Sequence, residues 1–221
     1  MPLDAQSVAD RLAAVRSRLD SAGGASVRIL AVTKGFDADV FAVAQQLGLH
    51  EVGENYAQEL LAKVAPVKPT GLSVHFIGQL QSNKVASLAG VVDTWQSVDR
   101  VNVADAIAKR SPGSTVFIQV NVSEEPQKGG CAMPDTDALV EHSRAAGLRV
   151  VGLMTVGKAG APLEVAQGFR WLRTCADRLG LPECSMGMSD DLEIAVREGS
   201  TMVRVGSALF GDRPGYGARN N

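Results

Sequence analysis

Lys34 is the side chain whose type and position most clearly suggest chemistry. It ends the apolar run RILAVTK (28–34), and alternation along a strand puts Leu30, Val32 and Lys34 on one face. If the two apolar residues fill a barrel interior, the amine points into its mouth. A desolvated amine there loses its charge more easily and becomes nucleophilic toward carbonyl groups. Taken alone, this strand favours the alternative of a solvated surface lysine.

A second candidate region is TMVRVGSALFG (201–211), in which Arg204 stands between two valines and shares a strand face with Gly206. An arginine on an inner strand needs partners, because an unpaired buried charge is very costly. The Gly206–Ser207 pair that follows can hold a phosphate through backbone N–H groups and a hydroxyl. Its alternative is an ordinary turn into a helix.

Short β-branched runs alternate with helical patterns along the whole chain and predict the elements that position these residues. We expect strands at 27–33, 51–53, 74–77, 91–96, 115–122, 149–155, 184–186 and 201–206. The expected helices are 4–20, 38–47, 57–64, 83–89, 101–109, 136–146, 163–179 and 190–198. This order predicts an α/β fold, a closed parallel (β/α)8 TIM barrel with an extra N-terminal helix, as a single domain over residues 1–221. The second and seventh strands are short, so a sheet of six or seven strands stays open.

In such a barrel the active site lies at the C-terminal ends of the strands. The residues at these ends are mostly polar: Lys34, Glu54, Asn55, Gly78, Gln79, Gln96, Ser97, Asn121, Met154, Thr155, Met186, Gly206 and Ser207. They contain no Ser-His-Asp set and no close carboxylate pair, so lysine is the obvious nucleophile. An amine for an aldehyde, an arginine for a ring nitrogen and a phosphate loop together describe a site for pyridoxal phosphate (PLP).

Composition and charge exclude several other classes. Net charge is −2 without Lys/Arg clusters, which argues against a nucleic-acid surface. Apolar runs fall short of the roughly 18 residues of a membrane helix, and the N-terminus has no apolar stretch typical of a secretory signal. Three cysteines without a CxxC pattern indicate reduced thiols in a cytoplasmic protein, and three distant histidines predict no metal site. We expect His75 to be a structural histidine packed at the third strand.

The sequence also resembles the pyridoxal phosphate homeostasis protein family, short single-domain relatives of the alanine racemase N-terminal barrel. The matching stretches are AVTK (31–34), GENYAQE (53–59), HFIGQLQSNK (75–84), QSVD (96–99), NVSEEPQKGG (121–130), GLMTV (152–156) and SMGMSDDLEIAVREGSTMVRVGSALFG (185–211). Two departures are the segment GFDADV after Lys34 and Val52 before the GEN motif. They concern the shape of one rim loop.

The resemblance implies a PLP fold-type III barrel that carries pyridoxal 5′-phosphate as a Schiff base on Lys34. Asn55 would then lie beside the ring, and Arg204 would face the pyridine nitrogen. The residues that the resemblance places around the ring and the phosphate are Ser185, Met186, Gly206 and Ser207.

The resemblance further implies a cytoplasmic, monomeric protein that stores, buffers or delivers PLP, with PLP-dependent apoenzymes as transient partners and no catalytic residues. Arginine does not readily give up a proton, so Arg204 would leave the ring nitrogen unprotonated and the ring a poor electron sink. The two tyrosines, Tyr56 and Tyr216, do not supply an evident second base. The alternatives are a small PLP-dependent amino-acid racemase and a class I aldolase-like barrel without cofactor.

Overall fold

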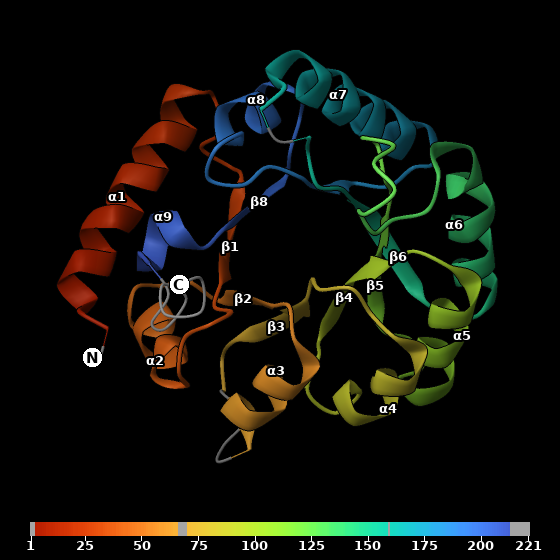
Figure 1. The fold of residues 1–221 in the computed structure, drawn as a ribbon, viewed down its shortest axis with the longest axis horizontal. Helices are drawn as coiled ribbons and strands as arrows, with labels where there is room; N and C mark the ends of the chain where they lie inside the picture. Colours follow the sequence, from red (N-terminus) through yellow and green to blue (C-terminus); the bar gives the residue numbers. More distant parts are fainter. Residues whose placement is uncertain (1–2, 66–69, 159, 213–221) are drawn as a thin grey trace.

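The eight strands close into a parallel barrel, seen along its axis in Figure 1. The computed structural model describes residues 3–65, 70–158 and 160–212. Each strand pairs in parallel with its neighbours in sequence, and the last strand pairs with the first. The strands are β1 (Arg28–Val32), β2 (Glu51–Glu54), β3 (Ser73–Phe76), β4 (Thr94–Val98), β5 (Thr115–Gln119), β6 (Arg149–Met154), β7 (Glu183–Ser185) and β8 (Met202–Val205). The predicted (β/α)8 barrel is confirmed, including its short second and seventh strands.

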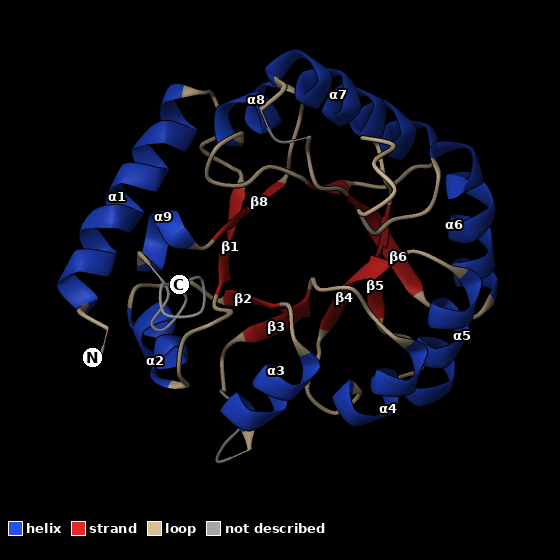
Figure 2. Cartoon of the chain, viewed as in Figure 1, coloured by secondary structure: helices blue, strands red, loops and turns tan. Residues whose placement is uncertain are grey.

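Helices surround the strands as an outer layer (Figure 2). They are α1 (Ala5–Ser21), α2 (Asp39–Gln46), α3 (Ala57–Val64), α4 (Val85–Leu88), α5 (Val101–Arg110), α6 (Thr136–Ala145), α7 (Pro162–Arg178), α8 (Leu192–Arg197) and α9 (Ser207–Phe210), with 3₁₀ turns η1 (Ser82–Lys84) and η2 (Met133–Asp135). The predicted extra N-terminal helix is α1, which packs beside α8 and α9. Asp4 caps it by accepting the backbone N–H groups of Gln6 and Ser7.

Alternation along the strands separates the barrel interior from the layer between strands and helices. On β8 the side chains of Val203 and Val205 belong to the apolar core under the helices, whereas Arg204 does not. Ala31 of β1 belongs to the same outer core. The opposite face of each strand therefore supplies the interior and the mouth of the barrel, as the sequence pattern predicts.

Several element boundaries differ from the prediction. β4 begins at Thr94 and not at Val91, because the apolar pair before it lies in the turn that follows α4. β5 ends at Gln119, after which Val120 makes only an isolated bridge with Cys131. The helix expected at 83–89 is a 3₁₀ turn followed by the single turn of α4. These are differences at element ends, and the strand order is unaffected.

Two kinds of feature are absent from the described residues. None of the helices in residues 3–65, 70–158 and 160–212 is long and apolar enough to cross a membrane. The same ranges contain no group of three or more His, Cys, Asp or Glu side chains placed to hold a metal ion.

Candidate functional site

A cavity of about 330 Å³ lies at the C-terminal ends of the strands. Five of the seven residues predicted for the site line it: Lys34, Asn55, Arg204, Gly206 and Ser207. The apolar part of the wall is formed by Val32, Phe36, Ile77, Met154 and Val156, and the segment after β7 adds Met188, Ser189 and Asp190. The barrel thus brings residues from both ends of the chain to one mouth.

Lys34 reaches this cavity because β1 ends just before it. Val32, Lys34 and Phe36 all line the cavity; Lys34 and Gly35 lie in a turn in which the Phe36 N–H donates to the Thr33 backbone oxygen. The ring of Phe36 also packs against Phe210 of α9, with 5.5 Å between the ring centroids. The segment that carries the amine therefore packs against α9, the helix that follows β8.

Arg204 is 4% exposed and is held by neutral acceptors. Its Nη1 donates to the backbone oxygen of Ser185 at 2.7 Å and to Ser185 Oγ at 3.0 Å, and its Nη2 donates to the backbone oxygen of Thr155 at 2.7 Å. Burial lowers the pKa of Arg204 to about 10, although the charge of Asp191 opposes this. Among the described residues no carboxylate forms an ion pair with the guanidinium. A buried cation whose partners are neutral is an unusual group to find lining a cavity.

Ser185 and Met186 do not line the cavity. Ser185 is fully buried and lies beneath Arg204 as its hydrogen-bond partner. Met186 is also fully buried, in the apolar core outside the barrel. The structure therefore separates these two residues, at the C-terminal end of β7, from the five that line the cavity.

Asn55 follows β2 and carries a buried oxygen, Oδ1, that has no hydrogen-bond partner among the described residues. Its backbone is close to the loop after β3: a Cβ on Gly78 would stand 1.8 Å from the Asn55 carbonyl oxygen. Only glycine fits at position 78 without moving one of the two loops. A buried acceptor left open beside a cavity is suited to a ligand.

Sequence reasoning missed Lys63, which forms a buried cluster under the loop that carries Lys34. We call Thr33, Glu54, Glu59 and Lys63 the outer cluster, since it lies between β1, β2 and α3. Lys63 Nζ lies 2.6 Å from Glu54 Oε1 and 2.7 Å from Glu59 Oε1, and it donates to the Thr33 backbone oxygen at 2.7 Å. The only sequence signal was the Glu59/Lys63 spacing, which is also typical of a solvated helix face.

The outer cluster fixes the backbone on both sides of Lys34. Thr33 donates its hydroxyl to Glu54 at 2.6 Å, and the backbone N–H of Gly35 donates to Glu59 at 2.5 Å. Burial raises the pKa of Glu54, while the neighbouring Lys63 acts in the opposite direction. Both Glu54 and Lys63 are almost fully buried, so the pair is shielded from solvent.

Comparison with known proteins agrees with this geometry. Residues 3–214 match the model of the alanine racemase N-terminal domain family. A pyridoxal phosphate homeostasis protein of Pseudomonas aeruginosa is 41% identical, over 97% of this chain and 97% of its own length. The chain belongs to the pyridoxal phosphate homeostasis protein family. The predicted resemblance is thereby confirmed.

Solved structures of related barrels support the fold assignment. PipY of Synechococcus elongatus, solved with PLP bound, has a TM-score of 0.79 and 32% identity, covering 92% of this chain and 100% of PipY. An alanine racemase of Clostridium difficile has a TM-score of 0.69 at 16% identity, covers 94% of this chain and is itself covered to 58%; this likeness concerns the fold alone. The barrel of this homeostasis-family chain is thus the predicted fold-type III barrel.

Of the two tyrosines considered as bases, Tyr56 is 56% exposed and does not line the cavity. Tyr216 lies outside the described residues. Among the described residues of this family member, the one carboxylate that lines the cavity is that of Asp190.

Proposed function

We propose that this chain binds pyridoxal 5′-phosphate at the mouth of the barrel, holds it as a Schiff base on Lys34, and acts in intracellular PLP homeostasis by storing, buffering or delivering the cofactor. The observation that carries the proposal is the buried guanidinium of Arg204, which shares one cavity with the amine of Lys34. The family membership supports it, and PipY, a relative of similar length, was solved with PLP bound.

The donor set of the cavity fits this cofactor. When bound, PLP supplies an aldehyde, a pyridine nitrogen and a phosphate. In our proposal Arg204 donates an N–H to the nitrogen, and Asn55 lies beside the ring with its open acceptor. Ser207 and the first N–H groups of α9, which have no partner within the helix, hold the phosphate together with Gly206.

Lys34 makes the covalent attachment in this proposal. Its amine would hold the cofactor through the aldehyde group of PLP, with which a neutral amine can condense with release of one water. Ser185 acts through Arg204. Met186, the first residue after β7, is proposed to shape the site through the backbone at the start of the loop.

We propose that turnover is slight. Arg204 keeps its proton, because even a guanidinium whose pKa is lowered to about 10 by burial stays charged at neutral pH. A ring nitrogen that faces it therefore remains unprotonated, which weakens carbanion chemistry. The proposal extends to a monomeric, single-domain protein of the cytoplasm that gives PLP to apoenzymes transiently; the three unpaired cysteines are in keeping with a reducing compartment.

The second candidate is a small PLP-dependent amino-acid racemase-like enzyme, favoured by one observation. Asp190 lines the same cavity as Lys34 and offers a carboxylate as a base. Loaded protein incubated with single amino-acid enantiomers in deuterated water separates the two candidates. Exchange of the α-proton at ordinary enzyme rates, abolished in Asp190→Asn, would replace the homeostasis proposal by this one.

Borohydride trapping tests the attachment directly. Wild-type protein titrated with PLP should turn yellow, and reduction followed by peptide mass spectrometry should find the cofactor on Lys34. Lys34→Ala should remain colourless after the same treatment. Lys109→Ala, which removes an exposed lysine on α5, should behave as wild type. Label on another lysine, or a yellow Lys34→Ala, would overturn the assignment.

A further inference from the structure

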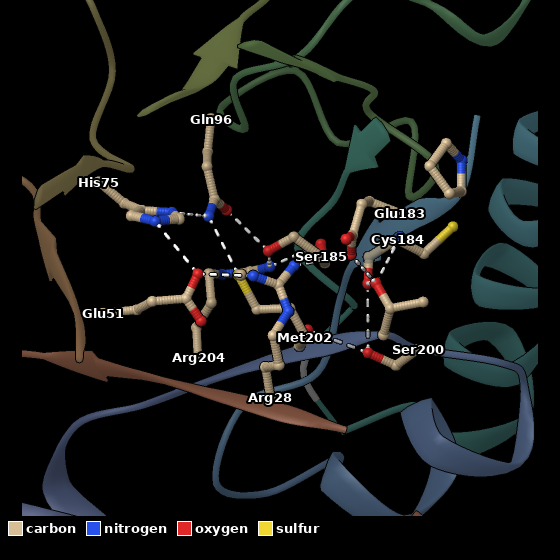
Figure 3. Close-up of polar contacts among 12 residues, drawn as sticks. Arg28, Glu51, His75, Gln96, Glu183, Cys184, Ser185, Ser200, Met202 and Arg204 are labelled. Carbon is tan, nitrogen blue, oxygen red and sulfur yellow. Dashed lines mark hydrogen bonds and ion pairs between the residues drawn. The ribbon is translucent and has the colours of Figure 1, made fainter. Parts of the chain in front are cut away.

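Four buried side chains form a continuous row of hydrogen bonds through the barrel interior (Figure 3). We call His75, Gln96, Ser185 and Arg204 the inner relay; they come from β3, β4, β7 and β8. Gln96 Nε2 lies 2.7 Å from His75 Nδ1, Ser185 Oγ lies 2.7 Å from Gln96 Oε1, and Arg204 Nη1 lies 3.0 Å from Ser185 Oγ. Each of the four is at most 4% exposed. The relay ends at the guanidinium that lines the cavity.

The chemistry of Arg204 fixes the direction of every bond in this row. A guanidinium has no acceptor, so Ser185 Oγ must accept from it and is left with its own proton to donate. That proton goes to Gln96 Oε1, which turns the amide nitrogen of Gln96 toward His75. Nδ1 of His75 must then be the acceptor, and the ring proton must be on Nε2.

A second contact of Gln96 supports the same direction. Its Nε2 also lies 3.2 Å from the sulfur of Met202, a weak acceptor. If the amide were reversed, its oxygen would face this sulfur, and the hydroxyl proton of Ser185 would lose its acceptor. Leaving a buried polar group without a partner costs more free energy than a typical hydrogen bond in a protein contributes. The observed direction therefore leaves each donor of the relay with an acceptor.

The far end of the relay lies at the opposite end of the barrel, where the strands begin. His75 Nε2 lies 3.5 Å from Glu51 Oε1 at the start of β2. Glu51 accepts from Arg28 Nη1 at 2.6 Å, and Arg28 Nη2 reaches Glu183 at 2.7 Å. Because Glu51 carries an acceptor toward Nε2, it selects the same His75 tautomer that Arg204 requires from the other end. Figure 3 labels Arg28, Glu51 and Glu183 together with the four residues of the relay.

We propose that His75, Gln96 and Ser185 are positioning residues that hold Arg204 toward the ring nitrogen of the cofactor, and that the Nε2–H tautomer of His75 sets the direction of the whole relay. The cofactor end of this inference rests on the proposed function; the tautomer does not. In the other tautomer Nδ1–H points at the Gln96 amide, the amide reverses, and its nitrogen donates to Ser185 Oγ, so the Ser185 hydroxyl proton loses its acceptor in the relay. Arg204 then shares Ser185 Oγ with a second donor, which weakens the side-chain contact that fixes its plane.

Nitrogen NMR tests the relay without any cofactor. The chain has three histidines, so protein labelled with ¹⁵N-histidine gives a simple ring spectrum, in which His75 is assigned from the signals missing in His75→Gln. In the apoprotein at neutral pH we expect Nδ1 of His75 to show the shift of an unprotonated nitrogen and Nε2 that of a protonated one. Protonated Nδ1, in either the neutral or the doubly protonated ring, would overturn the relay.

Two variants at one position separate positioning from mere packing. Glutamine at 75 can accept from Gln96 and donate to Glu51, so His75→Gln preserves the direction of the relay. His75→Leu removes both contacts. We expect His75→Leu to weaken PLP binding by about tenfold, as for loss of support to a charged donor, and to shift the absorption band of bound PLP. His75→Gln should restore both toward wild type.

If His75→Leu fails to fold, Ser185→Ala tests the same positioning role. It removes one hydroxyl and leaves the backbone acceptors of Arg204 in place. It should shift the same absorption band in the same sense. Identical spectra and affinities in wild type, His75→Leu and Ser185→Ala would overturn the positioning role. If wild type does not bind PLP at all, the proposed function fails, while the NMR measurement still decides the relay.

Discussion

The two sides of the candidate site are supported in different ways. Lys34 sits on a loop fixed by the outer cluster, in which the charges of Glu54, Glu59 and Lys63 meet between barrel and helix. Arg204 is supported by the inner relay, whose other members form neutral hydrogen bonds inside the barrel. The outer cluster holds backbone positions around a side chain that must reach a ligand. The relay holds the orientation of a side chain that must keep its own proton.

The difference predicts that the two regions fail differently when a member is removed. A buried ion pair that loses one partner leaves an uncompensated charge, whereas a neutral hydrogen bond that is lost leaves a smaller deficit. Damage to the outer cluster should therefore appear first as loss of stability. Damage to the relay should appear first in the spectrum and affinity of bound PLP.

The largest expected effect follows from removing Lys63. Lys63→Met leaves Glu54, which is 0% exposed, without its cation, and should lower the free energy of unfolding by about 3–5 kcal/mol. Urea unfolding followed by circular dichroism measures it. The double variant Lys63→Met/Glu54→Gln should recover much of the loss, because it removes the stranded charge. A single variant as stable as wild type would show that the outer cluster is not a buried ion pair.

A smaller effect is expected where backbone contact, without charge, positions the site. Gly78→Ala puts a Cβ 1.8 Å from the Asn55 carbonyl oxygen, so the loops after β2 and β3 must separate. We expect a loss of about 1–3 kcal/mol, typical of overpacking, together with weaker PLP binding. Gly90→Ala is the matched control, because its Cβ would meet nothing within 4 Å. Equal melting temperatures for the two variants would contradict the close approach.

The sequence was sufficient to predict Lys34 and Arg204 at one mouth, because strand alternation assigns each to a face and a parallel barrel brings all strand ends together. It was not sufficient for Lys63, since a lysine four residues after a glutamate is typical of a solvated helix face. Ser185 was predicted at the cofactor, whereas its hydroxyl lies under Arg204; strand position alone does not say whether a residue faces the cavity or the layer below. The predicted start of β4 was wrong, because Val91 and Val92 are apolar but lie in the connection between α4 and β4.

The last prediction uses pH, because the pKa values of two glutamates, Glu54 in the outer cluster and Glu51 beside the inner relay, are shifted in opposite directions. Burial raises the pKa of Glu54 above its ordinary value of 4.5, against the opposing charge of Lys63. For Glu51, below the inner relay, burial also acts to raise the pKa, but contacts with His75 and Arg28 outweigh it and lower the pKa below 4.5. A carboxyl with a raised pKa stabilises the fold below its ordinary pKa and loses that contribution as the pH rises. One with a lowered pKa stabilises above its ordinary pKa and loses that contribution as the pH falls.

Wild type should therefore lose stability relative to Glu54→Gln as the pH rises from about 4.5, and relative to Glu51→Gln as the pH falls below about 4.5. Urea midpoints of the three proteins, measured on both sides of this pH, give the two slopes. Slopes of the same sign would mean that the two regions do not differ in how they hold their carboxylates. Opposite slopes would show that burial dominates under Lys34, whereas paired contacts dominate at the foot of the relay.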